Sequence, residues 1–385
     1  MTVGADRVLV SPAWLRRAAT SILTGAGVPS SAAATVAEAL VDADMRGISS
    51  HGVMLLPMYV ERILAGSVSR ATEARVATDF GAIAVLDAEH ALGVLTADQA
   101  MTIALGKART HGIGLVTVRH AFHFGAAFRY VQQAARSGCI GVAACNTRPM
   151  MPAPGGAKAV VGNNPLAIGA PLGGEDAVIL DMALSEGALG KIRLAADEGR
   201  AIPENWATDG SGIPTTDPAA AIRGLLLPIA GPKGYGLALM LDVLSGVLSD
   251  GSYGSAVRGL YTDPAIANDC AHVFLAIDPR VFGDRSFASR VAALTTEVTS
   301  SPVAPDATRV LHPGQLEAER HRHAQRHGIA VPAAVLEKLA ETAAKLGVTR
   351  APKTSLRNGN GVPATRDPVA RNDPRHRSPS ERRRA

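Results

Sequence analysis

The feature of this sequence that most constrains its fold is a change of hydrophobic pattern near residue 72. Before that point, three stretches at 12–25, 30–45 and 53–65 carry apolar residues at helical spacing, and each ends at or near a glycine. After it, short apolar runs alternate with helical stretches, which is typical of an α/β or α+β fold. The sequence therefore predicts a helical unit followed by a mixed unit of strands and helices.

The mixed part contains a series of short expected elements. Apolar and β-branched runs predict strands, and longer amphipathic runs predict helices. The stretch 234–248 is apolar on nearly every side, and this pattern predicts a helix buried in the core. The other expected strands are 82–86, 114–118, 140–145, 167–170, 177–180 and 272–277, and the other expected helices are 96–110, 126–136, 315–327 and 332–346.

The net charge of +5 is misleading because the excess of basic residues lies in the segment 351–385. That segment is rich in Arg and Pro and has almost no large apolar residues, so we expect it to be disordered. The rest of the chain is close to neutral. Nucleic-acid binding is therefore not indicated.

Cysteine usage and hydropathy indicate the compartment. Cys139, Cys145 and Cys270 form no even disulfide framework and match no common zinc spacing. Prolines and charged residues interrupt the most apolar long stretch, 224–248, and the first residues lack an apolar run of signal length. We therefore expect a cytoplasmic protein with reduced thiols and no membrane span.

Common nucleotide-binding motifs are missing. No GxGxxG follows an expected strand, GPKGYG at 231–236 has a different glycine spacing, and there is no Walker A loop. The pattern therefore does not support a Rossmann domain. Glycine-rich and polar strings occur instead at 46–52, 119–125, 145–165 and 180–191.

These strings supply side chains suited to catalysis and nucleotide binding. His51 or His123 can exchange a proton near neutral pH, and Ser50 can hydrogen-bond an imidazole or a substrate oxygen. Asp181 can orient a histidine or bind a ribose hydroxyl, and Lys233 can pair with a phosphate. Each of these residues also has a purely structural interpretation, because a histidine in a loop is most often a structural residue and a lone lysine is usually solvated.

A metal site is the weaker hypothesis. His120 and His123 are three residues apart, but no third ligand is indicated, so we predict none. His321, His323 and His327 lie on an expected polar helix and are interpreted as surface residues.

Taken together and in order, the strings resemble the malate/L-lactate dehydrogenase family, which also contains ureidoglycolate and sulfolactate dehydrogenases, 2,3-diketogulonate reductase and piperideine-carboxylate reductase. The resemblance runs from about Arg16 to Gly347. Each string alone is weak evidence for the family, but seven strings in the expected order are strong evidence. They are RGISSHGV, LPMYVERILAGSV, HFGAA, NNPLAIGAP, LDMALSEGALGKI, IPENWATDGSGIPTTDP and GPKGYGLALMLDVLSGVLS.

The resemblance implies a non-Rossmann fold. A nicotinamide cofactor, NAD or NADP, is expected on a largely antiparallel sheet, with a helical domain built from both chain ends and a homodimer as the unit. The implied division places the helical domain at 1–72 and 283–350. The cofactor-binding and catalytic domain then spans 73–282, and the basic tail spans 351–385.

The resemblance also implies site residues. Ser50 and His51 match the family's Ser-His pair, and His123 matches the His of its HFG string; either histidine is a candidate proton donor or acceptor. Tyr59 matches a substrate-pocket tyrosine, and Asp181 is a further candidate catalytic residue. The implied cofactor-binding residues are His123, Phe124, Gly125, Thr147, Asp181, Met182, Ala183, Lys233, Pro313 and Gly314.

The sequence departs from the family pattern at three places. Leu55 stands where the family usually has an Arg that binds the substrate carboxylate. The HFG string is preceded by Ala-Phe at 121–122 instead of Ser-Asn, and Pro232 replaces a frequent His. If the substrate carries a carboxylate, Arg148 is the first candidate to replace the missing anchor and Arg46 the second.

The predicted function is hydride transfer between NAD(P) and a small 2-hydroxy or 2-keto acid. The alternative within the same family is an NADPH-dependent reductase of cyclic imino acids. An alternative of another class is a non-catalytic nucleotide-binding protein. Its only support is that Leu55 replaces the family's carboxylate-binding Arg. The sequence leaves the choice between NAD and NADP open.

Overall fold

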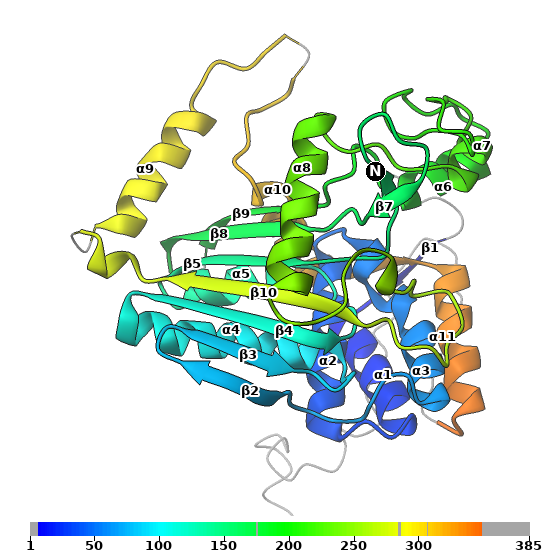
Figure 1. Cartoon of the computed structure of the whole chain (residues 1–385), viewed down its shortest axis with the longest axis horizontal. Helices are drawn as coiled ribbons and strands as arrows, with labels where there is room; N and C mark the ends of the chain where they lie inside the picture. The colour runs from blue at the N-terminus through cyan, green and yellow to red at the C-terminus, as the bar shows by residue number, and fades with distance from the viewer. Residues whose placement is uncertain (1–6, 175, 284–285, 306, 349–385) are drawn as a thin grey trace, which may run out of the picture. The chain divides into compact units, whose positions relative to one another are not determined.

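The computed structural model of the chain describes residues 7–174, 176–283, 286–305 and 307–348. Its centre is a seven-stranded sheet in which every neighbouring pair is antiparallel except β3–β4 (Figure 1). This confirms the predicted non-Rossmann, largely antiparallel architecture. In spatial order the strands are β2 (Arg75–Phe80), β3 (Ile83–Asp87), β4 (Ile113–Ala121), β10 (Cys270–Ile277), β5 (Ile140–Cys145), β8 (Leu166–Gly173) and β9 (Asp176–Met182).

Two helices, α4 (Gly93–His111) and α5 (Phe128–Arg136), cover one face of the sheet (Figure 1). The buried side of α4 is rich in alanine, which lets the helix lie close to the strands. A Cβ on Gly114 of β4 would come within 2.1 Å of the Ala104 carbonyl oxygen. Small residues on both elements therefore fix the separation between this helix and the sheet.

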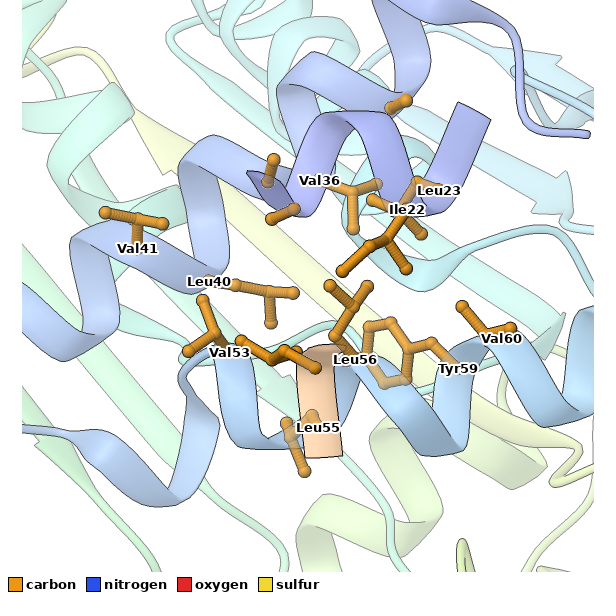
Figure 2. Close-up of a cluster of buried hydrophobic side chains, with 14 of the residues drawn as sticks. Ile22, Leu23, Val36, Leu40, Val41, Val53, Leu55, Leu56, Tyr59 and Val60 are labelled. Atoms are coloured by element: carbon orange, nitrogen blue, oxygen red, sulfur yellow. The ribbon is translucent and has the colours of Figure 1, made fainter. Parts of the chain in front are cut away.

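Helices from both chain ends form a second hydrophobic core. This helical cluster buries side chains of α1 (Pro12–Gly25), α2 (Ser30–Met45), α3 (Leu56–Ala65), α10 (Gln315–His327) and α11 (Ala333–Lys345). Figure 2 shows side chains of α1, α2 and α3 meeting in it. The short strand β1 (Arg7–Val10) pairs antiparallel with β11 (Ile329–Pro332) and joins the two ends directly. The expected helical domain from both chain ends is confirmed.

Local sequence explains where the N-terminal helices begin and end. Ser11 caps α1, because its hydroxyl accepts the Trp14 N–H and Pro12 occupies the first turn. Gly66 ends α3 in the left-handed conformation at φ +84°.

One arginine joins α3 to the loop that precedes β10. Arg62 is fully buried, and its guanidinium donates to the carbonyl oxygens of Gly259, Leu260 and Ile266 at 2.8–2.9 Å. Burial lowers the pKa of this side chain. The three carbonyl bonds and the nearby charges of Glu61 and Asp263 offset part of the cost of desolvating the guanidinium.

The helix expected as a buried core element at 234–248 is partly exposed, so that prediction is wrong. The segment forms α8 (Pro232–Asp242) followed by a π-helical turn (Val243–Val247). One side packs on the sheet, and its Asp242 points inward to Asn146 and the Gly254 N–H. The other side exposes Leu237, Leu239, Met240, Val243, Leu244, Val247 and Leu248, each by 37–53%. An apolar pattern reports that a surface avoids water, but it does not say which molecule covers it.

Several elements lie outside the expectations. All positions of β2 are exposed, so its sequence lacks the alternation that predicts strands. The helix α9 (Phe287–Thr299) buries no residue in the chain, and β11 occupies the residues just before the expected start of α11. The tail expected to be disordered lies outside the described residues.

One surface assignment also changes. His321 of α10 contacts Asp42 of α2 at 3.0 Å, so it joins helices from the two chain ends. Within the described ranges, no helix is long and apolar enough to cross a membrane.

We expect Arg62→Met to lower the free energy of unfolding by about 3 kcal/mol, because it leaves three carbonyl groups, one of them in a fully buried contact, without their donor. Chemical denaturation measures this, with Arg17→Met on the exposed side of α1 as the matched control. A loss below about 1 kcal/mol would show that the loop is held by other contacts.

A second prediction concerns acid stability. His272 of β10 is fully buried and stacks on Phe124 at 4.7 Å between ring centroids, and burial lowers its pKa to about 3. The unfolded chain therefore takes up a proton below about pH 6.5 that the folded chain refuses, so stability falls as pH decreases. We expect His272→Phe to reduce the loss between pH 7 and pH 5 by about 2 kcal/mol. Denaturation at both pH values tests this against His111→Phe on exposed α4 surface; equal losses in the wild type and His272→Phe would contradict it.

Candidate active site

A cavity of about 580 Å³ lies between the turn after α2 and one end of the central sheet. The turn after α2 supplies Arg46, Ser50 and His51, and the turn after β4 supplies residues 123–128. The other walls come from Thr147 and Asn163, from residues 179–183 of and after β9, and from Lys191, Pro313, Gly314 and Glu317. Most residues predicted for the site, far apart in the sequence, therefore meet at one place.

Two histidines lie side by side in this cavity. The rings of His51 and His123 are stacked with centroids 5.5 Å apart. His51 belongs to a 3₁₀ turn (Ser49–His51), and its Nδ1 lies 3.0 Å from the Ser50 hydroxyl. The Nδ1 of His123 lies 2.7 Å from the Tyr59 hydroxyl. Because Nδ1 is engaged on each ring, Nε2 is the atom left to contact a ligand.

Both imidazoles are neutral at physiological pH. Burial lowers the pKa of His51. Burial, with smaller contributions from His51 and His272, lowers that of His123 to about 3. The N-terminus of α4 also reaches this segment, since a Cβ on Gly93 would lie 1.9 Å from the Phe122 carbonyl oxygen. The positive end of a helix disfavours an imidazolium.

Tyr59 lies beneath His123 and not on the cavity wall, where the resemblance places a substrate-pocket tyrosine. It is fully buried in the helical cluster, and burial raises its pKa, so the phenol stays protonated. Phe122, which stands where the family usually has the Asn before HFG, packs edge-on against the Tyr59 ring with centroids 5.1 Å apart. The hydroxyl of Tyr59 therefore acts on the ring of His123.

Leu55, at the position where the family usually has an Arg that binds the substrate carboxylate, is a core residue in this chain. Leu55 is 3% exposed and lies in the helical cluster (Figure 2). Arg148 is not among the residues that line the cavity; its side chain packs against Gly259. Arg46 does line it, bonded to Asp42 and Gln132.

Asp181 joins the sheet to α5. Its Oδ2 accepts the Phe128 N–H at 2.8 Å, which caps the N-terminus of that helix. Burial, followed by the nearby Glu317 charge, raises its pKa to about 6. Gly314 lies against Ile179 at φ +83°, where an added Cβ would come within 2.9 Å of the Ile179 carbonyl oxygen. The C-terminal segment thus reaches the same wall as Asp181.

The opposite wall is a network of polar side chains. The Thr147 N–H donates to Asn164 Oδ1 at 2.8 Å, and its hydroxyl donates to Asn163 Oδ1 at 3.1 Å. Lys233, predicted to contact the cofactor, is exposed near the start of α8 and is not among the lining residues. Lys191 of α6 (Leu189–Asp197) lines the cavity instead.

Sequence reasoning missed the roles of Lys191, Asn163 and Glu317. The first two lie inside the glycine-rich strings already noted, so their place in those strings was a usable indication. Nothing in the sequence indicated Glu317. It reaches the cavity because Pro313, just before α10, accepts a hydrogen bond from the Ile179 N–H of β9 at 3.1 Å.

Metal binding finds no support in the part of the chain that is described. There, no group of three or more His, Cys, Asp or Glu could hold a metal ion. His120, considered with His123 as a metal pair, bonds instead to Asp87 at 3.0 Å.

Comparison with known proteins finds dehydrogenases of similar sequence. Ureidoglycolate dehydrogenase (NAD(+)) of Escherichia coli K12 is 39% identical over 310 residues, which cover 80% of this chain and 88% of the relative. The (2R)-3-sulfolactate dehydrogenase (NADP(+)) of Chromohalobacter salexigens is 36% identical over 266 residues, covering 69% and 80%.

Solved structures show the same fold. Sulfolactate dehydrogenase from Methanocaldococcus jannaschii superposes with a TM-score of 0.83 at 34% identity, covering 89% of this chain and 98% of that one. Δ1-Piperideine-2-carboxylate reductase from Pseudomonas syringae gives a TM-score of 0.79 at 28% identity, covering 87% and 100%. Residues 10–340 match the family described as malate/L-lactate dehydrogenase. Because this match spans most of the chain and the relatives share up to 39% identity with it, the chain belongs to the malate/L-lactate dehydrogenase family.

Proposed function

We propose that this chain is a cytoplasmic NAD(P)-dependent oxidoreductase that transfers a hydride between the nicotinamide and a small 2-hydroxy or 2-keto acid. The observation that carries the proposal is the pair His51 and His123, held neutral and stacked on the wall of the cavity. Relatives named for ureidoglycolate and sulfolactate support the substrate class, and three buried free cysteines support a reducing compartment.

The cavity fits a nicotinamide dinucleotide. Its volume lies within the range of small-molecule sites. Thr147, Asn163 and Asp181 offer polar groups suited to ribose hydroxyls and amides, and Gly314 allows close backbone approach. Lys191, on the first turn of α6, is suited to a phosphate. When bound, the nicotinamide ring supplies or accepts the hydride.

The two histidines have different environments, and this suggests different roles. In the oxidative direction the substrate hydroxyl must give up its proton as the carbon loses a hydride. We assign this proton to Nε2 of His51, whose partner Ser50 is exposed and can pass it to solvent. His123, with its strongly lowered pKa and its bond to Tyr59, stays neutral and orients the substrate oxygen. Reduction runs the same proton transfer in reverse.

Arg46 is the better of the two candidate carboxylate anchors. It lines the cavity, whereas Arg148 does not. Its Nε and one terminal nitrogen bond Asp42 and Gln132, which fixes the guanidinium and leaves the other terminal nitrogen for a ligand.

A second candidate function is reduction of a cyclic imino acid. The solved neighbour named for Δ1-piperideine-2-carboxylate favours it. A non-catalytic nucleotide-binding role is disfavoured, because Leu55 packs in the core and leaves both histidines in place.

We expect His51→Ala to lower kcat by about 10²–10⁴-fold, the range of general acid–base catalysis, and His123→Ala to lower it less. Turnover is measured with NADH and NADPH against a panel of 2-keto acids and cyclic imines, which also separates the candidate functions. His111→Ala, on exposed α4 surface, is the matched control. If both variants keep near wild-type turnover, the two-histidine mechanism is wrong.

We further propose that the chain forms a homodimer through the exposed apolar side of the 232–248 helix. Seven aliphatic side chains at helical spacing are more than a monomer normally leaves in water, and the segment carries no exposed charge after Lys233. A self-complementary apolar surface suits a two-fold contact with a second copy.

We expect the wild type to have twice the 39.6 kDa chain mass by light scattering, and Leu244→Glu to shift it toward one chain mass. The control is Phe80→Glu, which changes an apolar residue that is 75% exposed on β2. A monomeric wild type, or a Leu244→Glu variant with unchanged mass, would exclude this interface.

A further inference from the structure

A half-buried carboxyl group lies directly on the turn that carries His51. Asp44 belongs to the last turn of α2, and its Oδ2 accepts the Val53 N–H at 2.9 Å. A Cβ built on Gly52 would lie 2.1 Å from Oδ1 and 2.4 Å from Oδ2 of the same carboxyl. The carboxyl group therefore packs on the Cα of Gly52, and only glycine leaves room for it.

The bonded amide begins the next helical run. Val53 opens a 3₁₀ turn (Val53–Leu55) that continues into α3, and the first amides of such a run have no partner within it. A carboxyl group at this end satisfies one amide and complements the positive end of the helix. Asp44 thus acts as a cap supplied by the preceding helix.

Both histidines depend on this junction. His51 lies two residues before Val53, and Tyr59, which bonds His123, lies six residues after it on α3. A shift of the junction would move His51 directly and would move His123 through Tyr59. The 5.5 Å ring separation therefore depends on where the junction is held.

We infer that Asp44 is a positioning residue that sets the geometry of the two-histidine site by holding Gly52 and Val53 against the end of α2. This inference rests on the proposed hydride-transfer function. Asp44 touches neither ring by a hydrogen bond, so its effect passes through the backbone of the turn.

The neighbouring acid on α2 has a different task. Asp42 contacts Arg46 and His321 and so ties α2 to α10. No ion pair of Asp44 occurs among the described residues, and burial raises its pKa to about 7. The hydrogen bond from the Val53 N–H requires an acceptor oxygen at residue 44, which an asparagine also supplies.

The first test compares two substitutions of the same side chain. We expect Asp44→Ala to lower kcat at least tenfold, because an ångström of misplacement is enough for such losses, with the cofactor KM changed less than about twofold. Asp44→Asn should recover most of the lost kcat. The matched control Glu38→Gln, on the exposed side of α2, should behave as the wild type.

Amide hydrogen exchange supplies a readout independent of activity. Peptides covering residues 49–56 should exchange faster in Asp44→Ala than in the wild type, and at the wild-type rate in Asp44→Asn. Wild-type kcat in Asp44→Ala, or equal losses of kcat in the Ala and Asn variants when both are folded, would overturn the inference.

A double-mutant cycle tests the contact itself. The methyl of Gly52→Ala collides with the carboxyl group, so this variant should lose activity, whereas the Asp44→Ala background leaves space for it. We expect the combined variant to be more active than the product of the two single losses, and strict additivity would contradict the contact. If the wild type transfers no hydride, the proposed function fails while exchange still tests the contact. If only Asp44→Ala is normal and the histidine variants are inactive, the inference alone fails.

Discussion

The arrangement of the site depends on the hydrogen bonds that hold α3 against the segments next to the central strands β4 and β10. Arg62 holds the loop before β10, and one turn earlier Tyr59 reaches the residue that follows β4. Because β4 and β10 are neighbours in the sheet, these two contacts join the helical cluster to the middle of the sheet. Both are buried polar contacts, so each is costly to break and neither has an alternative partner in water. The cavity is the space that this junction encloses.

Desolvation sets the chemistry of that space. Burial lowers the pKa values of the two histidines and raises those of Asp44 and Asp181. It therefore disfavours the positive charge of the histidines and the negative charge of the two carboxyl groups. A hydride moves most readily where water and stray protons are excluded and where fixed dipoles replace solvent. The apolar cluster around Tyr59 shields from water the side of His123 that Tyr59 contacts.

Much of the fold follows from local sequence. The cap at Ser11 and the glycine at the end of α3 mark the helix ends correctly, and β-branched runs mark β4, β5 and β10. β2 could not be predicted, because it is recruited by pairing with β3 and has no buried face of its own. α8 was placed correctly as a helix but wrongly as buried, because hydrophobicity does not identify the covering partner.

The candidate site was predictable only in part. Ser50, His51, His123 and Asp181 are brought together as expected, because they occur in strings whose order matches the family. Tyr59, Arg148 and Lys233 were expected at the cavity and lie away from its wall. Their positions depend on the packing of α3, of the loop near Gly259 and of α8, and none of these contacts is encoded within a few residues of the side chain concerned.

The pairing of β1 with β11 has a consequence for how this chain is made. During synthesis the first three helices emerge long before α11 and β11, which complete their apolar core. At ordinary elongation rates the gap lasts tens of seconds, far longer than hydrophobic collapse takes. During that interval the apolar side chains of the N-terminal helices that later pack against α11 and β11 stay exposed to water. The chain thus completes its cavity, which Pro313, Gly314 and Glu317 help to line, only after the start of its last helices has left the exit tunnel.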